Sequence, residues 1–335
     1  MKNLRDSWAY KGGKSRMEFQ HIPVLYQEVL DGLDLKKGGT YVDGTVGGGG
    51  HSSGILAAIG KDGRLLAIDQ DENALRAAKE RLAPYAEQVT FFHSNYIEMP
   101  SIIDEYAPDG VDGILIDIGV SSPQIDDYRR GFSYMHDAAL DMRMNPQADF
   151  SAYDVVNTYD EDALERILRE YGEEKWARRI AKIIIERRAI APIETTFQLV
   201  DCIERAIPKG AREKGSHVAK RTFQAIRIEV NHELDVLEGV IDEAVARLKI
   251  GGRMAVITFH SLEDRIVKQH FKYLASDCIC PPELPICQCD KEATVKIVTR
   301  KPIVASKEEL ADNSRAGSAK LRIVEKIPAY KRRKY

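Results

Sequence analysis

The sequence predicts an α/β fold in which a helix-covered parallel sheet is interrupted by an inserted all-helical domain. Short apolar strands alternate with amphipathic helices over residues 20–121. The strand signal then disappears over residues 122–221, where helical patterns replace it, and it returns at residues 253–259. Strands that alternate with helices imply a parallel sheet with helices on both faces. The 335 residues suit one large or two modest domains.

The first part of the chain predicts four strands, each of which ends in a polar residue or glycine. These strands are expected at residues 40–43, 64–69, 89–93 and 113–117. Amphipathic helices lie between them, as at residues 72–82. Because parallel strands of such a sheet end at the same edge, we expect a ligand to bind at their carboxyl ends.

The inserted segment predicts a basic helical lobe. Helices are expected at residues 160–171, 173–188 and 196–207. By the 3.6-residue period, the second has one apolar face and one basic face. The apolar face holds Trp176, Ile180, Ile183 and Ile184, and the basic face holds Lys175, Arg178, Arg179 and Lys182.

The last part of the chain is expected to complete the sheet. Apolar residues at helical spacing from Phe223 to Leu248 predict one long helix that ends at Gly251-Gly252. Strands follow at residues 253–259, 294–299 and 321–326, the last two as a terminal hairpin. The expected organisation is a disordered extension at 1–18, a sheet domain at 19–121 and 225–327, a helical insert at 122–224 and a basic tail at 328–335.

A glycine-rich loop, Gly44-Thr45-Val46-Gly47-Gly48-Gly49-Gly50, joins the first strand to a helix. Glycine allows positive φ angles and lets a ligand lie against the backbone. Four adjacent glycines also cost folding entropy, and we expect no packing gain from them, so we interpret the loop as a ligand site. Asp69 ends the next strand twenty residues after Gly49, the offset typical of a carboxylate that binds a ribose. The loop therefore predicts a nucleoside-containing cofactor.

The spacing within the loop favours S-adenosylmethionine over a dinucleotide. The dinucleotide pattern G-x-G-x-x-G lacks its third glycine, because Gly47-x-Gly49 leads to Ser52. Small residues instead follow the strand-end acid Asp43 at two, four and six positions, with Thr45 in place of the first glycine. This is the methyltransferase form of the loop, and it argues against a dehydrogenase.

Further motifs lie downstream of the loop. They are Asp117-Ile118-Gly119-Val120-Ser121-Ser122-Pro123-Gln124, Arg130-Gly131-Phe132-Ser133-Tyr134, Leu140-Asp141-Met142-Arg143-Met144, Tyr171-Gly172-Glu173-Glu174, Arg221-Thr222-Phe223-Gln224-Ala225 and Phe259-His260-Ser261-Leu262-Glu263-Asp264-Arg265. With the glycine loop, they closely resemble the bacterial small-subunit ribosomal RNA cytosine-N4 methyltransferases, the RsmH (MraW) family. The match runs in the same order from about Phe19 to Lys326.

This resemblance implies a Rossmann-like class I methyltransferase with an inserted all-helical domain. The family uses S-adenosylmethionine to methylate the exocyclic N4 amine of a cytidine in the decoding region of 16S rRNA, so the implied partner is that RNA or the small ribosomal subunit. The implied cofactor-binding residues are Gly49, Gly50, His51, Asp69, Tyr96, Asp117 and Gln124. Among them, Asp69 would hold the ribose and Tyr96 would pack on the adenine. One departure is Asn313-Ser314-Arg315-Ala316-Gly317-Ser318, where the family has Asn-Pro-Arg-Ala-Arg-Ser.

We assign catalysis to Asp117, at a strand carboxyl end, as the acceptor of hydrogen bonds from the amine. His260 is a candidate base, but Ser261 with Asp264 three residues on is equally typical of a helix cap. Phosphate contacts are expected from Arg143, Arg178, Arg179 and Arg221, and base stacking from Phe132. Tyr134 and Phe223 are candidates for stacking or, preferably, for core packing.

Composition leaves several function classes open. The net charge of −3 favours no particular partner, and no apolar run approaches the ~18 residues of a membrane span. The absence of a secretory signal and the odd number of cysteines, five, favour a reduced cytoplasmic protein. Methylation of a DNA cytosine or a small amine, and a non-catalytic RNA-binding role, remain alternatives. The basic insert argues against a small substrate, and the intact acids argue against a non-catalytic role.

Four cysteines cluster as Cys278-x-Cys280 and Cys287-x-Cys289. Four thiolates can bind zinc tetrahedrally. The C-x-C spacing is shorter than that of common zinc sites, which favours the alternative of four reduced thiols in a surface loop.

Overall fold

The structure is a computed structural model that describes residues 23–120, 124, 127–212, 215, 217–281, 283–284 and 287–331. The expected extension at 1–18 and the tail residues 332–335 lie outside the described residues. In the described part of the chain, no helix has the length and apolar character needed to cross a bilayer.

The described residues form a seven-stranded sheet with the order β3-β2-β1-β4-β5-β7-β6. The strands are β1 (Thr40–Asp43), β2 (Arg64–Asp69), β3 (Val89–His93), β4 (Val111–Asp117), β5 (Leu248–Thr258), β6 (Ala293–Ile297) and β7 (Lys320–Tyr330). Strands β1 to β5 pair in parallel, and β7 pairs antiparallel with both β5 and β6. Among these strands, β7 alone therefore runs in the opposite direction. The predicted α/β class is therefore confirmed, and β1, β2 and β3 have the predicted bounds.

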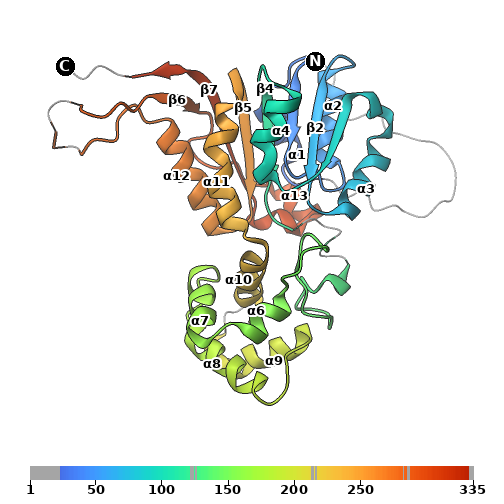
Figure 1. The fold of residues 1–335 in the computed structure, drawn as a ribbon, viewed down its shortest axis with the longest axis vertical. Coiled ribbons are helices and arrows are strands. Elements are labelled where there is room, and N and C mark those ends of the chain that lie inside the picture. Colours follow the sequence, from blue (N-terminus) through green and yellow to red (C-terminus); the bar gives the residue numbers. More distant parts are fainter. Residues whose placement is uncertain are drawn as a thin grey trace.

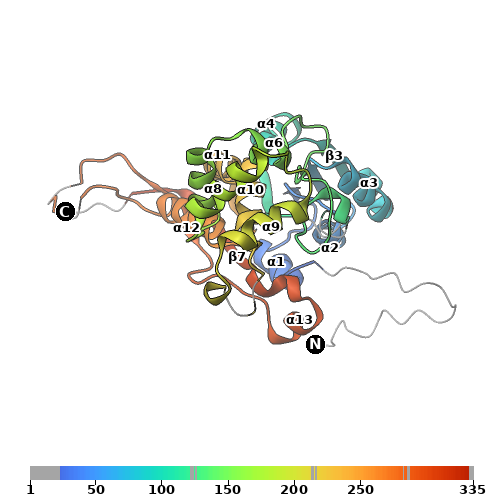
Figure 2. The same ribbon diagram turned by 90° about the horizontal axis from the view of Figure 1, so that it is seen from below.

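Helices cover both faces of the sheet (Figures 1 and 2). One face packs against α1 (Tyr26–Leu33), α2 (Gly50–Ile59), α3 (Glu72–Arg81) and the segment around α13 (Lys307–Asp312). The other packs against α4 (Met99–Tyr106), α11 (Glu233–Ala246) and α12 (Ser261–Leu274). Buried aliphatic side chains fill both interfaces, as Ile55 does on the first face and Ile241 on the second.

A helical lobe lies beyond the carboxyl ends of the parallel strands (Figure 1). It contains α6 (Ala152–Thr158), α7 (Glu161–Glu170), α8 (Ala177–Arg188), α9 (Thr196–Ala206) and α10 (Lys220–Asn231). Its core includes Ile180 and Cys202 and continues to Val230, past the expected boundary at residue 224, because α10 is unbroken. Helix α8 begins at Ala177, not at residue 173, since Glu173 has a positive φ of 48°.

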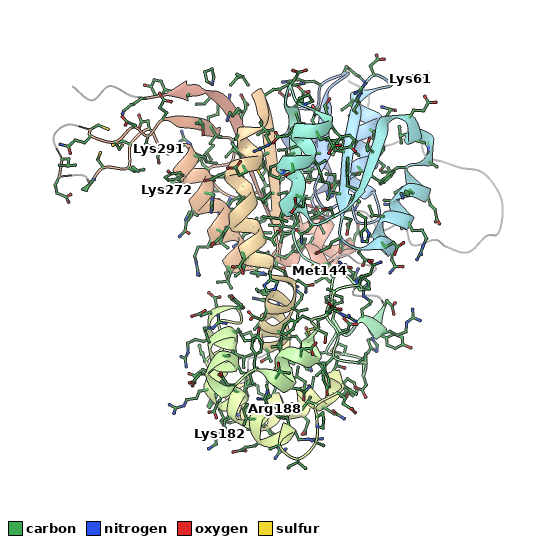
Figure 3. The ribbon with its side chains drawn as sticks, in the orientation of Figure 1. Lys61, Met144, Lys182, Arg188, Lys272 and Lys291 are labelled. Carbon is green, nitrogen blue, oxygen red and sulfur yellow. The ribbon has the colours of Figure 1, made fainter. Side chains whose placement is uncertain are left out.

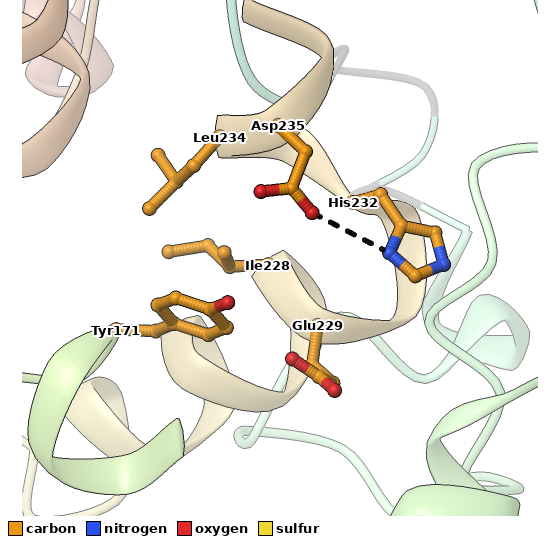
Figure 4. Close-up of a pocket in the computed structure, with 6 residues that line it drawn as sticks. All are labelled: Tyr171, Ile228, Glu229, His232, Leu234 and Asp235. Carbon is orange, nitrogen blue, oxygen red and sulfur yellow. Dashed lines mark ion pairs between the residues drawn. The ribbon is translucent and has the colours of Figure 1, made fainter. Parts of the chain in front are cut away.

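The prediction of one long helix before β5 is wrong. Helix α10 ends at Asn231 and α11 begins at Glu233, because His232 between them adopts a left-handed conformation with φ 50° and ψ 37°. Figure 4 shows this break, with Nδ1 of His232 4.0 Å from the Asp235 carboxylate. The pocket beside it measures about 10 Å³, room for a single water. The predicted stop at Gly251-Gly252 is also wrong, because β5 runs through both glycines.

Candidate functional site

The polar side chains at the carboxyl ends of β1, β2 and β4 lie together at the edge of the sheet that faces the helical lobe. Strand β1 lies between β2 and β4, so the adjacent strand ends carry Asp43, Asp69 and Asp117. Met144, in the segment that connects β4 to the lobe, marks this region in Figure 3. The predicted ligand edge is therefore also the junction between the two parts of the chain.

Asp69 and the glycine loop bind each other directly. The Gly47 amide, at a φ of 50°, donates a hydrogen bond of 2.8 Å to Oδ2 of Asp69. The Asp71 amide donates to Oδ1 at 2.9 Å. Burial raises the pKa of Asp69 to about 6, although the two hydrogen bonds from backbone amides act to lower it. A carboxylate has about four acceptor positions, so Asp69 keeps capacity for ribose hydroxyls.

The four glycines of the loop have different roles, which corrects the expectation that they contribute nothing to packing. A Cβ on Gly49 would lie 3.2 Å from Cγ of Leu82, and one on Gly50 would lie 2.4 Å from Cγ of Pro23. These two glycines let α2 pack closely against its neighbours. A Cβ on Gly48 would meet nothing within 4 Å. Gly48 is therefore the position at which the loop presents bare backbone to open space.

Asp43 supports the loop from beneath. Its buried carboxylate accepts hydrogen bonds from the Ser52 hydroxyl at 2.6 Å and from the Thr45 amide at 3.2 Å. Burial raises its pKa to about 6. The hydroxyl oxygen of Thr45 in turn accepts a hydrogen bond of 2.7 Å from the Asp117 amide. Thr45, which replaces the first glycine of the pattern, thus connects the loop to the end of β4.

The side chain of Asp117 is 28% exposed, yet its Oδ1 atom is buried and has no hydrogen-bond partner among the described residues. Burial, with the nearby charges of Asp43 and Glu263, raises its pKa to about 8. A buried acceptor without a partner costs free energy, which a ligand donor at this position would recover. Asp117 is therefore the residue of this edge best placed to receive a donor group.

His51 contacts Asp117 and not open space. Its Nε2 lies 3.1 Å from the carbonyl oxygen of Val24, so Nε2 carries the proton and donates. Its Nδ1, which faces Oδ2 of Asp117 at 3.8 Å, is then the unprotonated nitrogen. Burial lowers the pKa of His51 to about 4, so the ring is neutral at pH 7. Its direct contact with a cofactor stays a prediction.

Gln124 contacts an ion pair between Asp71 of the sheet domain and Arg130 of the segment that leads to the lobe. The sequence analysis did not identify this ion pair. Its Nε2 donates to Oδ2 of Asp71 at 3.0 Å, and Nη1 of Arg130 donates to the same oxygen at 2.9 Å. Burial alone would raise the pKa of Asp71, but these donors outweigh it and lower the pKa. Arg130 also donates to the carbonyl oxygens of Arg143 and Met144. The partners are far apart in the sequence, so no local pattern reveals them.

Tyr96 lies beside a buried group of charged side chains. It begins a short 3₁₀ helix after β3, and burial together with Glu233 and Glu263 raises the pKa of its hydroxyl. Nε and Nη2 of Arg227 bind the carboxylate of Glu233 at 2.8 and 2.9 Å. Packing of Tyr96 on an adenine stays a prediction.

His260 is a helix cap, but with a partner other than the one expected. It is the N-cap of α12 in a capping box with Glu263, whose Oε2 accepts from the Phe259 amide at 2.8 Å. The expected cap pair takes part in other contacts. Ser261 donates to Glu173 of the lobe at 2.8 Å, and Asp264 binds Arg322.

The predicted RNA contacts lie on several parts of the lobe. Arg178 and Arg179 are exposed in the first turn of α8, where the Arg179 guanidinium lies 5.9 Å from the ring centroid of Trp176. Arg143 binds the carboxylate of Asp141 at 2.7 and 2.8 Å. Arg221 lines a pocket of about 140 Å³ in the lobe.

The three aromatic candidates have different surroundings. Phe223 is 3% exposed and belongs to the lobe core, as preferred. Tyr134 is half-buried and stacks on His217, with ring centroids 4.4 Å apart. Phe132 is half-buried, and the Arg130 guanidinium lies over its ring, with Cζ 5.7 Å from the ring centroid. Of the three, Phe132 and Tyr134 keep part of their surface for a base.

Comparisons with known proteins show the family of the chain. Residues 18–327 match the family model described as the MraW methylase family. The chain is 57% identical to "Ribosomal RNA small subunit methyltransferase H" of Clostridioides difficile (strain 630) over 311 residues, 93% of this chain and 100% of that protein. It is 56% identical to the protein of the same name from Clostridium botulinum (strain Loch Maree / Type A3), again over 93% of this chain and 100% of that protein. A solved rRNA methylase from Streptococcus thermophilus matches with a TM-score of 0.36 and 12% identity, over 90% of this chain and 94% of that one, and nothing further follows from it.

Proposed function

The chain belongs to the MraW methylase family, and on that premise we propose that it methylates the exocyclic N4 amine of a cytidine in the decoding region of 16S rRNA, with S-adenosylmethionine as cofactor. Its relatives that are 55–57% identical are named as methyltransferases of small-subunit ribosomal RNA. The choice of the N4 amine rests on the site, and above all on the buried Oδ1 of Asp117 that has no partner within the described residues.

The edge of the sheet fits S-adenosylmethionine. Gly48 offers backbone with nothing within 4 Å of its Cβ position, where a methionine group can lie. Asp69, fixed by the Gly47 and Asp71 amides, keeps acceptor positions for two ribose hydroxyls. When bound, the cofactor supplies a methyl group on a positively charged sulfur. Partly buried carboxyl groups nearby, at Asp43, Asp69 and Asp117, complement that charge.

Asp117 has the geometry of an amine acceptor. The lone pair of a cytosine N4 is delocalised into the ring, so the nitrogen is a poor nucleophile. Oδ1 of Asp117 accepts an N–H of the amine, which turns the lone pair out of conjugation and toward the methyl group. The ionised form of Asp117 is the better acceptor, and a cation beside it favours that form. No covalent enzyme intermediate is needed, because positioning alone can supply about 7–11 kcal/mol.

The helical lobe supports recognition of a folded RNA. Exposed positive charge lies on α8 at Arg178, Arg179 and Lys182 and just before this helix at Lys175. A base must leave its stack to reach a site of this kind, and half-buried rings such as Phe132 can stack on it. The bonds from Arg130 to Asp71 and from Ser261 to Glu173 connect the lobe to the sheet domain on two sides of the junction.

The test is an incubation of the full chain with labelled S-adenosylmethionine and small ribosomal subunits that lack this methylation. Nucleoside mass spectrometry should then detect N4-methylcytidine in the decoding region of the RNA. Parallel reactions with free 16S rRNA, a DNA duplex and free cytidine distinguish the alternative substrates. If the protein binds the cofactor but yields no N4-methylcytidine from subunits or rRNA, the proposal is wrong.

A further inference from the structure

We infer that Cys278, Cys280, Cys287 and Cys289 bind one structural zinc ion through four thiolates. The four cysteines lie in the segment that leads from the end of α12 to β6, which projects from the sheet domain near the C-terminus (Figure 1). Their Sγ atoms all lie within 4.8 Å of one another. The site lies outside the methyl-transfer edge, so its test does not depend on the proposed function.

The distances between the sulfur atoms fit a tetrahedral metal site. Cys287 Sγ lies 3.5 Å from Cys278 Sγ, 3.9 Å from Cys280 Sγ and 3.6 Å from Cys289 Sγ. Cys289 Sγ lies 3.9 Å from Cys278 Sγ. Four sulfurs at the usual Zn–S distance of about 2.3 Å in a tetrahedron are about 3.8 Å apart. The two C-x-C pairs thus lie against each other and bring four sulfurs together. The short spacing within each pair is therefore compatible with a tetrahedral zinc site.

Backbone donors complete the surroundings expected of thiolates. The Ile279 amide, between the first two cysteines, donates to Cys289 Sγ at 3.4 Å. The Gln288 amide, between the other two, donates to Cys280 Sγ at 3.3 Å. Each pair therefore supplies an amide to a sulfur of the opposite pair, which stabilises negative charge on sulfur. The Lys331 ammonium binds the carbonyl oxygen of Cys289 and lies 3.7 Å from the Asp290 carboxylate, so it connects the cysteine segment to the end of β7.

The cysteine segment has little else to hold its shape. Its large apolar side chains face solvent, with Ile279 56% and Leu284 39% exposed. The four cysteines are themselves only half-buried. A segment that cannot bury a core is commonly held by a metal or by disulfides, and all four cysteines are free thiols. Zinc would fix the end of α12 relative to β6, an outer strand that pairs with β7 alone.

A second group in the described residues has ligand atoms equally close, Glu233, His260 and Glu263. It does not suit a metal. The Arg227 guanidinium already binds both oxygens of Glu233. Backbone amides occupy Oε2 of Glu263. The cysteines have no such competing cation on their sulfur atoms.

The first test is a metal analysis of the full chain, purified under reducing conditions without an immobilised-metal column. Plasma mass spectrometry should find about one zinc per chain after gel filtration, and less than about a tenth of an equivalent would overturn the proposal. Alkylation of the denatured, unreduced protein should modify all four cysteines, whereas two disulfides would contradict it. Replacement of zinc by Co²⁺ should give the absorption bands of a tetrahedral tetrathiolate site. An octahedral Co²⁺ spectrum would refute it.

Variants assign the metal to these cysteines. The double substitution Cys280→Ser and Cys287→Ser removes one ligand from each pair and should lower zinc content at least tenfold. Cys202→Ala is the matched control, since Cys202 is a buried thiol of the lobe core and should leave zinc content unchanged. Zinc that persists in the double variant would refute the assignment. If the double variant does not fold, the Co²⁺ spectrum of the unchanged protein still decides the question.

Discussion

Nδ1 of His51 lies 3.8 Å from Oδ2 of Asp117, and neither group is charged near neutral pH before a ligand binds. The pKa of His51 is lowered to about 4 by burial. The pKa of Asp117 is raised to about 8 by burial and by the charges of Asp43 and Glu263. A carboxyl group next to an imidazole would ordinarily form an ion pair. Here burial and the neighbouring negative charges keep these two groups neutral until a cation arrives.

Asp117→Ala removes both acceptor oxygens and should lower turnover by more than about a hundredfold, the range seen when one transition-state hydrogen bond is lost. Binding of S-adenosylmethionine should weaken much less, because Asp69 and the glycine loop remain. Rapid-quench methylation of subunits and calorimetry of cofactor binding measure the two effects. Turnover close to that of the unchanged enzyme would exclude Asp117 as the amine acceptor.

The pH profile should show the ionisation of Asp117. If only the carboxylate form of Asp117 accepts the hydrogen bond from the amine, kcat/KM should rise with pH up to about 8 and be constant above it. Asp117→Asn should have low activity and a flat profile over that range. A profile in the unchanged enzyme that is flat from pH 6 to about 9 would contradict the assignment.

The same ionisation should make the ligand-free protein less stable as pH rises. The native Asp117 keeps its proton up to about pH 8, whereas in the unfolded chain it loses it near the ordinary value of 3.8. The native state thus binds more protons between these values, so stability falls from about pH 4 to about pH 8. Asp117→Asn should remove the part of this slope that Asp117 contributes and leave that of Asp43 and Asp69, whose pKa values are raised to about 6. It should raise the free energy of unfolding at pH 8.5 by several kcal/mol, at about 1.4 kcal/mol per pKa unit. Urea unfolding at pH 5.5 and 8.5 measures it, and an unchanged slope in Asp117→Asn would count against the raised pKa.

Two substitutions in the glycine loop should separate cofactor binding from folding. Gly48→Ala places a methyl group where nothing lies within 4 Å, so stability should change by less than about 0.5 kcal/mol while cofactor affinity falls at least tenfold. Gly49→Ala should destabilise by about 1–3 kcal/mol, because φ is 76° and the new Cβ would crowd Leu82. Thermal unfolding and calorimetry distinguish the two. Equal cofactor affinity in Gly48→Ala would mean that the cofactor does not lie against Gly48.

Arg130→Met should destabilise the junction between lobe and sheet domain by about 3 kcal/mol, because it leaves the buried Asp71 without its cation. Arg129→Met is the matched control. Its guanidinium is 76% exposed and pairs only locally with Asp127, so it should cost less than about 1 kcal/mol. Urea unfolding measures the free energy of unfolding of the two variants, which can be compared directly if their m values are equal. Similar losses in both variants would show that the bond to Asp71 has no special role.

Substitution of both Arg178 and Arg179 by alanine should weaken RNA binding and reduce the dependence of log K on log salt by about one unit per lost phosphate contact. Cofactor affinity should not change. Lys61→Ala, an exposed charge at the far end of the sheet domain (Figure 3), is the control. An unchanged salt dependence in the double variant would remove α8 from the RNA-binding surface.

Strands β1, β2 and β3 were predictable because each is a short, mostly apolar run bounded by glycine or polar residues. Strands β5 and β7 are longer than predicted, 11 residues each, because their pairing continues through charged residues that the apolar pattern leaves out. The break at His232 was not predictable, because the apolar spacing continues from Val230 to Leu237 across it. No glycine or proline marks the turn, and a single left-handed residue changes the helix direction without interrupting the pattern. The apolar periodicity of a sequence indicates which face of a helix is buried. It does not indicate whether the helix axis changes direction.

The acids of the site were predictable from their places at strand ends, and their partners were not. Asp43, Asp69 and Asp117 follow apolar runs, whereas the Arg130 that binds Asp71 ends a short 3₁₀ helix (Tyr128–Arg130) far along the chain. The role of His260 as a cap was missed in detail because histidine is not among the preferred N-cap residues. Local sequence thus identifies the groups that a strand presents, and tertiary packing selects their partners.

The register of β4 against β5, in which Asp117 lies opposite Ile257, has a consequence for how the protein is made. The whole helical lobe separates these two strands along the chain, so their pairing has a high contact order and forms slowly. During synthesis, β4 leaves the ribosome long before its neighbour exists. We expect nascent or truncated chains that end before β5 to lack methylating activity, so that the enzyme becomes active only when its helical lobe is already in place.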